Sequence, residues 1–363
     1  MKVAIAGGGT AGHVNPAIAL AQQLGKETDL LFVGTTRGIE ARLVPAAGFD
    51  LATIEVQGFD RSRPHLLPLV GARALRAVFD VRATLKRFGP DVVVGMGGYV
   101  SLPTCLAARS LGVPVVLHEQ NIVLGLAHRV SKPFADRLAV SFGQTLEQAG
   151  PKGVFTGNPV MQRFLTVNRQ SLKGAALTEM GLSVDRSIVL VFGGSLGARR
   201  VNEATVELAR LWAAREDVQI LHITGRDSLT SVLSTAADIP SAVYKPVAFI
   251  EDMVSAYAVA DVAVCRGGAT TVAELCVMGL PAVIVPYPHH RDRQQERHAE
   301  VLKEAGAALV LDDQETTGGR LAEVVGALLA DPGRLVRMSE ASLSVARPDA
   351  ARRLADVVRE VVG

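Results

Sequence analysis

The sequence has few cysteines and no long apolar run. Its three cysteines, Cys105, Cys265 and Cys276, are odd in number, form no Cys-x-x-Cys pair and lie among apolar residues. This usage indicates a reducing compartment and argues against disulfides and structural zinc. Only Val3–Ala6 precede the first glycines, too short a run for a secretory signal, and the uncharged stretch 92–108 contains three glycines and a proline. We therefore expect a cytoplasmic protein without a membrane span.

The chain contains the same half twice. The block Asp91-Val-Val-Val-Gly-Met-Gly-Gly98 returns 170 residues later as Asp261-Val-Ala-Val-Cys-Arg-Gly-Gly268. Near the start of each half an apolar run leads into glycines, at 3–12 and at 188–197. A buried parallel strand that feeds a phosphate-cradling turn has this pattern. Two such halves predict a cleft between them, where the function should lie.

Strand-like and helix-like segments alternate along the chain, which predicts an α/β protein with parallel sheets. We expect strands near 2–6, 29–33, 91–95, 114–118 and 137–140, and again near 187–192, 218–223, 242–245, 261–264 and 282–285. Helices are expected at 15–24, 71–88, 199–214, 270–278 and 292–305. A last helical segment covers about 335–361. The predicted domains are 1–162 and 163–340, followed by a C-terminal helix segment, 341–363.

Both halves carry a glycine-rich loop that can bind an anion. Gly7-Gly-Gly-Thr-Ala-Gly-His13 is either a backbone anion site at a helix start or only a tight turn. A dinucleotide dehydrogenase would also need an acid near the end of the second strand, but Gly34-Thr-Thr-Arg37 stands there. In the second half, Gly193-Gly-Ser-Leu-Gly-Ala-Arg199 offers backbone N–H groups, a hydroxyl and a guanidinium, which suit a diphosphate leaving group.

A carboxylate follows the second glycine pair of the C-terminal half. Glu274 comes four residues after Thr270, on the same face of the predicted helix that follows Arg266-Gly-Gly268. It can accept from both hydroxyls of a ribose, or it can simply be a glutamate that the helix dipole favours. His289 and His290 have no third ligand at a metal-binding spacing, and the chain lacks Asp-x-Asp. This favours a metal-independent reaction with no cofactor.

Polar residues end a predicted strand in the first half, at His118-Glu-Gln-Asn121. Four such residues in the crevice of an open sheet suggest a functional site. Either His118 or His13 could act as a base, because imidazole titrates near neutral pH, although each could also be structural.

The segment 61–87 contains seven Lys and Arg residues, with Asp80 as its only acid. Leu75, Val78, Phe79, Arg82 and Leu85 recur at helical spacing. The segment is either a core-facing helix with a solvated basic face or a surface that docks on anionic lipid.

Six motifs occur in an order that resembles one family. They are Gly7-Gly-Gly-Thr-Ala-Gly-His13, Gly95-Met-Gly-Gly-Tyr-Val-Ser101, His118-Glu-Gln-Asn121, Gly157-Asn-Pro159, Gly193-Gly-Ser195 and Asp292-Arg-Gln-Gln295. Over about residues 1–310 the chain resembles the MurG family of N-acetylglucosaminyltransferases. The resemblance implies a GT-B fold, with two Rossmann-like parallel-sheet domains facing a cleft and a C-terminal helix crossing back to the first domain.

The resemblance also implies an activity. An inverting enzyme of this family moves GlcNAc from UDP-GlcNAc to the C4 hydroxyl of the MurNAc unit of lipid I, undecaprenyl-pyrophosphoryl-MurNAc-pentapeptide, and so forms lipid II. It would work without a cofactor, bound peripherally to the anionic cytoplasmic face of the cell membrane, with no nucleic acid as partner. Two alternatives are a UDP-GlcNAc 2-epimerase of the same fold and a non-catalytic sugar-nucleotide sensor.

The family's roles are carried over to matching positions. His13 is the first candidate for the base and Glu119 the second, and the acceptor is expected near His13, Tyr99, His118 and Glu119. Met161 stands where many members carry an arginine, which makes Arg163 a candidate substitute. The implied donor site comprises Thr10, Ala11, Gly12, Asn121, Arg163, Ser195, Ile250, Ala269, Thr270, Thr271, Val272, Ala273, Glu274, Gln294 and Gln295.

Overall fold

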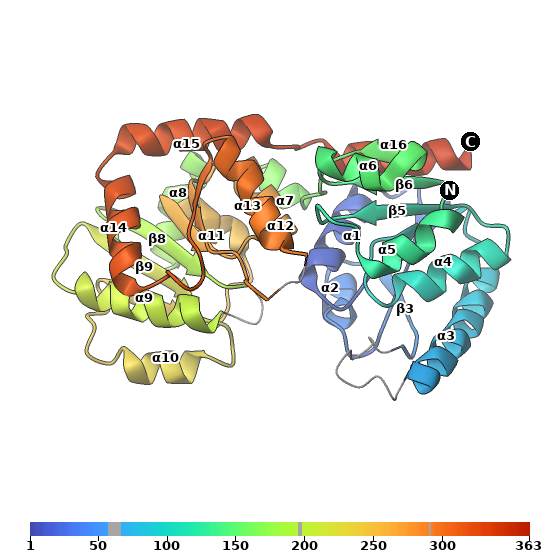
Figure 1. Ribbon diagram of the computed structural model, residues 1–363, viewed down its shortest axis with the longest axis horizontal. Coiled ribbons are helices and arrows are strands. Elements are labelled where there is room, and N and C mark those ends of the chain that lie inside the picture. The colour runs from blue at the N-terminus through green and yellow to red at the C-terminus, as the bar shows by residue number, and fades with distance from the viewer. Residues whose placement is uncertain (57–66, 195–197, 290–291) are drawn as a thin grey trace. The chain divides into compact units, whose positions relative to one another are not determined.

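The computed structural model describes residues 1–56, 67–194, 198–289 and 292–363, with only the backbone described at 67–75. The chain divides into two compact units (Figure 1). The N-terminal unit comprises Met1–Gln162 and Arg347–Gly363, and the C-terminal unit comprises Arg163–Ala346.

The N-terminal unit has a seven-stranded parallel sheet within the described residues, in the order β3-β2-β1-β4-β5-β6-β7. The order reverses between β1 and β4, which creates a topological switch point at the carboxyl ends of these strands. The strands are β1 (Lys2–Ala6), β2 (Asp29–Gly34), β3 (Asp50–Thr53), β4 (Val92–Gly95), β5 (Val115–Glu119), β6 (Arg137–Val140) and β7 (Gly153–Phe155). The helices are α1 (Ala11–Leu24), α2 (Glu40–Ala46), α3 (Leu67–Phe88), α4 (Ser101–Ser110), α5 (Leu126–Ser131), α6 (Leu146–Ala149) and α16 (Ala350–Val362).

Alternate residues of β1 belong to different cores because successive strand side chains point to opposite faces. Val3 and Ile5 join a cluster with α1 and with Leu354 and Val358 of α16, whereas Ala4 joins a cluster with α3 and α4. Both faces of the sheet are therefore covered, as a parallel sheet requires.

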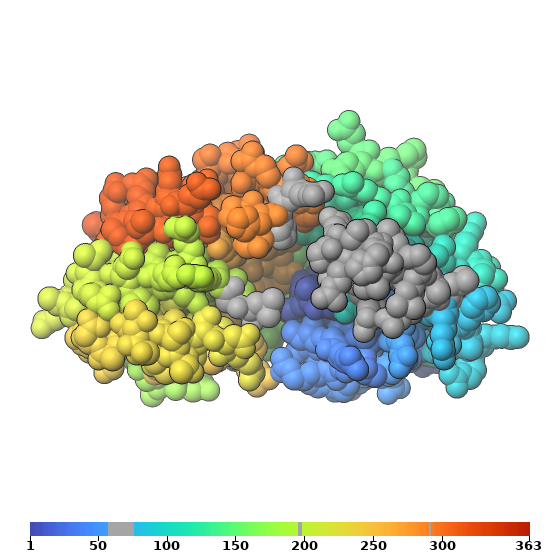
Figure 2. Space-filling view, turned by 60° about the horizontal axis from the view of Figure 1, so that its bottom comes forward, coloured from blue at the N-terminus to red at the C-terminus, as the bar shows by residue number. Residues whose placement is uncertain are grey.

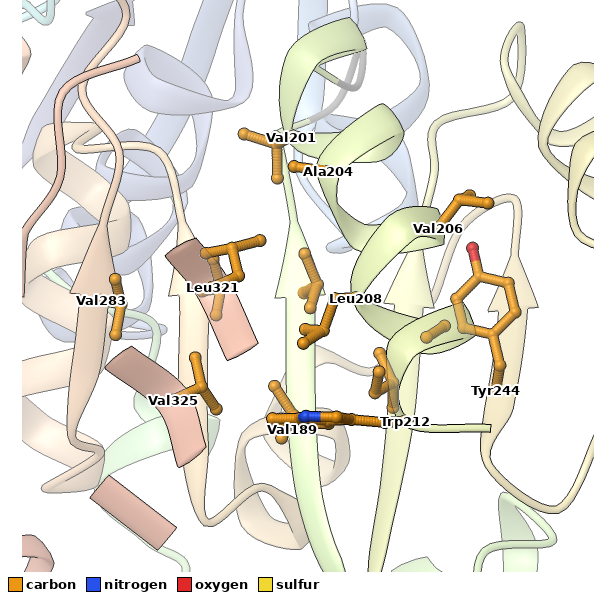
Figure 3. Close-up of a cluster of buried hydrophobic side chains, with 14 of the residues drawn as sticks. Val189, Val201, Ala204, Val206, Leu208, Trp212, Tyr244, Val283, Leu321 and Val325 are labelled. Carbon is orange, nitrogen blue, oxygen red and sulfur yellow. The ribbon is translucent and has the colours of Figure 1, made fainter. Parts of the chain in front are cut away.

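The C-terminal unit repeats this plan with a six-stranded parallel sheet in the described residues, in the order β10-β9-β8-β11-β12-β13. Val201 and Leu208 of α9 and Trp212, directly after it, pack over Val189 of β8, together with Leu321 and Val325 of α14 (Figure 3). The strands are β8 (Ser187–Phe192), β9 (Val218–Ile223), β10 (Tyr244–Val247), β11 (Val262–Cys265), β12 (Ala282–Ile284) and β13 (Ala308–Val310). The helices are α7 (Gln162–Leu165), α8 (Arg169–Glu179), α9 (Arg199–Leu211), α10 (Leu229–Thr235), α11 (Met253–Val259), α12 (Ala269–Met278), α13 (Gln294–Glu304), α14 (Gly318–Leu329) and α15 (Pro332–Val345).

The predicted parallel sheets are confirmed, and the differences lie at the edges and at the end of the chain. The short outer strands β3, β7 and β13 were not predicted. The single helical segment expected over 335–361 was wrong: it is two helices, interrupted near Pro348, where the ring of proline disfavours a helical conformation at the residue before it. A boundary at 341 falls inside α15, and the chain re-enters the N-terminal unit at Arg347.

The predicted helix at 71–88 is α3, and its described side chains form two faces. Ala77, Val81 and Leu85 are buried in the core, whereas Phe79 is 63% exposed. Arg61, Arg63 and Leu66 lie outside the described residues, as do the side chains of Arg73 and Leu75. No helix in the described part of the chain is long and apolar enough to cross a bilayer.

Candidate active site

The sheet register of the N-terminal unit brings three predicted motifs together. Ala6, the last residue of β1, lies opposite Gly95 of β4, and Gly95 lies opposite Leu117 of β5. The loops that follow these strands therefore emerge side by side at the carboxyl end of the sheet. Three predicted residues lie at this end: His13 at the start of α1, Tyr99 in the loop after β4, and Glu119 as the last residue of β5.

His13 lies in the first turn of α1 and is partly exposed. Its Nδ1 is 3.2 Å from the carbonyl oxygen of Gly8 and 3.1 Å from the hydroxyl of Thr10. Because a carbonyl only accepts, Nδ1 carries the hydrogen in a neutral ring, and the lone pair is on Nε2. Among the described residues none forms a hydrogen bond with Nε2, which lies beside Gly97.

The pKa of His13 lies below its usual value, mainly because burial disfavours the charged ring. His13 is therefore a neutral imidazole near neutral pH, with a lone pair available at Nε2. These are the two properties that a general base requires.

Glu119 is enclosed by hydrogen-bond donors and is only 2% exposed. Its Oε1 accepts from the backbone N–H and the side-chain amide of Asn121, at 2.9 and 3.0 Å. Its Oε2 accepts from the N–H of Gly125 at 2.8 Å and from Nδ1 of His128 at 2.7 Å. Burial raises the pKa of Glu119, but His128 and the N–H donors outweigh this effect and bring the pKa to about 2. A carboxylate with such a low pKa is a weak base, so His13 is the better candidate for the general base.

His118 is fully buried and does not reach the surface. Its Nε2 donates to the carbonyl of Gly157 at 3.1 Å, and its Nδ1 accepts from the amide of Gln120 at 3.0 Å. Burial lowers its pKa to about 4, so the ring is neutral. His118, expected among the acceptor contacts, is thus buried in the structure. Tyr99, another expected contact, is half-buried and its ring lies over Gly9.

The C-terminal unit also gathers its predicted residues at one sheet edge. Phe192 of β8 lies opposite Cys265 of β11, so Gly193-Gly194 and Arg266-Gly267-Gly268 emerge next to each other. α12 then starts at Ala269, and Thr270, Thr271, Val272 and Ala273 form its first turns. Ser195 lies outside the described residues.

Glu274 of α12 is 8% exposed, and its Oε2 accepts from the hydroxyl of Tyr257 at 3.0 Å. Burial raises the pKa of Glu274 to about 7, although Tyr257 and the positive charge of Arg163 oppose the rise. No motif marks Tyr257, which is buried against Phe164 and Phe192. Glu274 is therefore poised to change its charge near neutral pH.

Gln295 fixes the turn that precedes α12. Its Oε1 accepts from the N–H groups of Gly267 at 3.1 Å and Tyr287 at 3.0 Å. The neighbouring Gln294 donates to Asp292 at 2.5 Å. Ile250 is half-buried, in the connection between β10 and α11. In the described chain, no three His, Cys, Asp or Glu side chains are grouped so as to hold a metal ion.

Two of the site's buried titratable side chains were missed by sequence reasoning, Glu40 and His128. Each lies in the first turns of a short helix, with no motif around it. Only the fold brings them to the loops that carry His13 and Glu119.

Comparison with known proteins covers nearly the whole chain. Residues 3–140 match the glycosyltransferase family 28 N-terminal domain, and residues 188–354 match the glycosyltransferase family 28 C-terminal domain. The UDP-N-acetylglucosamine–N-acetylmuramyl-(pentapeptide) pyrophosphoryl-undecaprenol N-acetylglucosamine transferase of Halothermothrix orenii is 38% identical, over 99% of both chains.

Solved structures show the same architecture. MurG of Acinetobacter baumannii has a TM-score of 0.74 and 28% identity, over 99% of both chains. UDP-GlcNAc 2-epimerase of Neisseria meningitidis, solved with UDP-GlcNAc, has a TM-score of 0.70 but only 12% identity, over 99% of this chain and 100% of its own. At that identity the likeness extends to the fold alone.

Proposed function

Because the chain belongs to the MurG family of glycosyltransferase family 28, we propose that it transfers GlcNAc from UDP-GlcNAc to lipid I and so forms lipid II. The observation that carries this function is the 38% identity with a transferase of that name over 99% of both chains. The epimerase of Neisseria meningitidis shares the GT-B fold, but its sequence is only 12% identical to this chain. The protein is thus a glycosyltransferase of peptidoglycan synthesis.

His13 is proposed as the general base. Its Nε2 takes the proton of the C4 hydroxyl of MurNAc while the hydroxyl oxygen attacks the anomeric carbon of GlcNAc. The bond from that carbon to the diphosphate oxygen breaks, UDP leaves, and the anomeric configuration is inverted. The hydrogen on Nδ1, held by the Gly8 carbonyl, keeps Nε2 as the accepting nitrogen.

The C-terminal unit is proposed to hold the donor. The carboxylate of Glu274 accepts from the ribose hydroxyls, and Ile250 contacts the uracil. The turns at 193–194 and 266–268 and the start of α12 supply N–H groups to the diphosphate as its negative charge increases. The remaining proposed donor contacts are Thr10, Ala11, Gly12, Asn121, Arg163, Gln294 and Gln295.

The basic face of α3 is proposed to hold the enzyme on anionic lipid. Arg76, Phe79, Lys86 and Arg87 are exposed and recur at helical spacing along one side of α3 (cyan in Figure 2), which also carries one exposed acid, Asp80. The opposite side, with Ala77, Val81 and Leu85, is packed in the core. The exposed cations and the phenyl ring suit a negatively charged membrane surface, where the acceptor is found.

Changing Arg76, Lys86 and Arg87 together to Gln should weaken binding to anionic liposomes about 100-fold. Each cation near such a surface contributes about 1 kcal/mol. Sedimentation with liposomes measures the loss, and turnover of a short-chain soluble acceptor should persist. The matched control changes Lys303, Arg320 and Arg337, exposed cations of the C-terminal unit, to Gln. If the wild-type protein does not sediment with anionic liposomes at low salt, this role is contradicted.

The activity itself is tested by incubating the protein with UDP-GlcNAc and a lipid I analogue and following the products by mass. We expect UDP and an acceptor heavier by one GlcNAc residue. An epimerised donor without transfer would support the epimerase, and binding without any product would support the sensor.

A further inference from the structure

Glu40 is a buried carboxylate that the proposed mechanism does not yet use. It lies in the first turn of α2 and is 0% exposed. Its Oε1 accepts from the backbone N–H and the hydroxyl of Thr35, at 2.9 and 2.8 Å. Its Oε2 accepts from the N–H of Gly9 at 2.9 Å. Burial raises the pKa of Glu40, but the bonds from Gly9 and Thr35 outweigh it and the pKa falls below its usual value. The group is an anion held by neutral donors.

The chain builds a close-fitting pocket for this carboxylate from glycines. A Cβ atom added at Gly8, Gly34 or Gly38 would lie 2.5, 2.6 or 2.1 Å from atoms of Glu40. No real side chain tolerates such distances. The three glycines therefore leave room for the Glu40 side chain and fix its position beneath the 7–12 loop.

One peptide unit connects Glu40 to His13. The N–H of Gly9, which donates to Glu40, and the C=O of Gly8, which accepts from Nδ1 of His13, belong to the same planar group. Its two polar ends point in opposite directions, so the carboxylate and the imidazole hold it from both sides. A hydrogen bond from the N–H to an anion makes the carbonyl oxygen more negative, because linked hydrogen bonds polarise one another.

We propose that Glu40 is the positioning carboxylate of the base, acting on His13 through the Gly8–Gly9 peptide. It fixes the Nδ1–H tautomer, sets the orientation of the ring and increases the basicity of Nε2. In serine hydrolases a carboxylate does this by contacting the histidine directly. This inference rests on the proposed role of His13 as base.

The charges around His13 agree with this arrangement. Glu119 from β5 and Glu40 from α2 raise the pKa of His13, whereas burial, the largest effect, and His128 from α5 lower it. Tyr99 is a further titratable side chain at this loop, and its ring lies over Gly9. Removing the charge of Glu40 should therefore lower the pKa of His13 further.

The Glu40→Gln variant tests the inference, because it keeps the size of the side chain and removes the charge. We expect kcat to fall about 10- to 100-fold, the size of the loss when the outer hydrogen-bond partner of a metal-ligating histidine is removed. The acid limb of the kcat/KM profile should move to lower pH, because the base stays unprotonated further into the acid range. A purely structural role would reduce the folded fraction or raise KM, with the limb unmoved.

Thr35→Val is the matched control: it removes one hydrogen bond to Glu40 but keeps its charge and its bond to Gly9. The acid limb should stay in place. In a His13→Ala background, Glu40→Gln should cause no further loss of kcat, because Glu40 affects the reaction only through His13.

The wild-type protein provides a test that does not depend on whether the variant folds. Nitrogen NMR of the His13 ring should show the Nδ1–H tautomer in the neutral form, and an Nε2–H tautomer would overturn the inference. An unmoved acid limb in Glu40→Gln, with His13→Ala impaired, would overturn it too. If His13→Ala is as active as the wild type, it is the proposed base that fails.

Discussion

Replacing His13 with Ala should lower kcat by about 10²- to 10⁴-fold and leave the affinity for UDP-GlcNAc nearly intact. The change removes the proton acceptor at Nε2, whereas the donor contacts proposed on the C-terminal unit are untouched. Steady-state kinetics with a soluble lipid I analogue measure the rate, and calorimetry measures donor binding.

The pH profile adds an independent check on His13. A base must be unprotonated, so activity should be lost as the pH falls through its pKa. Because burial lowers this pKa, the loss should occur below the ordinary range of a histidine. Glu119→Gln provides the comparison: if that variant is folded but inactive while His13→Ala retains its rate, Glu119 is the base.

Replacing Glu274 with Ala should weaken UDP-GlcNAc binding at least about 100-fold. Two hydrogen bonds from ribose hydroxyls to a charged acceptor contribute roughly 1.5–3 kcal/mol each, and 1.4 kcal/mol corresponds to a factor of about ten. Calorimetry with UDP-GlcNAc measures the change. Glu274→Gln is the matched variant, since its amide oxygen still accepts from Tyr257 and preserves the buried contact. Unchanged affinity in both variants would remove Glu274 from the donor site.

Donor binding should also depend on pH through Glu274. Its pKa is about 7 in the free protein, and the ionised form is the better acceptor for ribose, so affinity should rise as the pH rises through about 7. In Glu274→Gln this dependence should disappear. In Tyr257→Phe the rise should move to higher pH, because the lost hydroxyl had lowered the pKa of Glu274.

The centre of each sheet was predictable, and the edges were not. β1, β4, β8 and β11 are buried on both faces, so they have nearly continuous apolar sequences with glycine at or within two residues of their ends. Edge strands are covered less completely. β7 is three residues long and only partly buried, so its sequence has no distinctive pattern. Its position depends on pairing with β6, which is a property of the fold.

The site was predictable where a motif marks a loop, and not where one buried residue supports that loop from another element. Gly34-Thr-Thr-Arg37 stands where a dinucleotide dehydrogenase would place an acid, and this argued only against that class of enzyme. The next acid, Glu40 at the start of α2, turns inward to the glycine loop, and no motif predicted this contact. The polar run at 118–121 was correctly placed at a strand end. However, His118 and Glu119 are largely used in hydrogen bonds of their own unit.

The chain order of the two units has a consequence for synthesis on the ribosome. The C-terminal unit is continuous and interrupts the N-terminal unit, whose helix α16 follows all of it. Leu354 and Val358 of α16 complete the core around Val3, Ile5 and α1. Since chains fold as they emerge, the apolar side of β1 and α1 stays without its α16 contacts until the whole C-terminal unit has been synthesised. During that interval the nascent N-terminal unit presents an uncovered apolar face, the kind of surface to which chaperones bind.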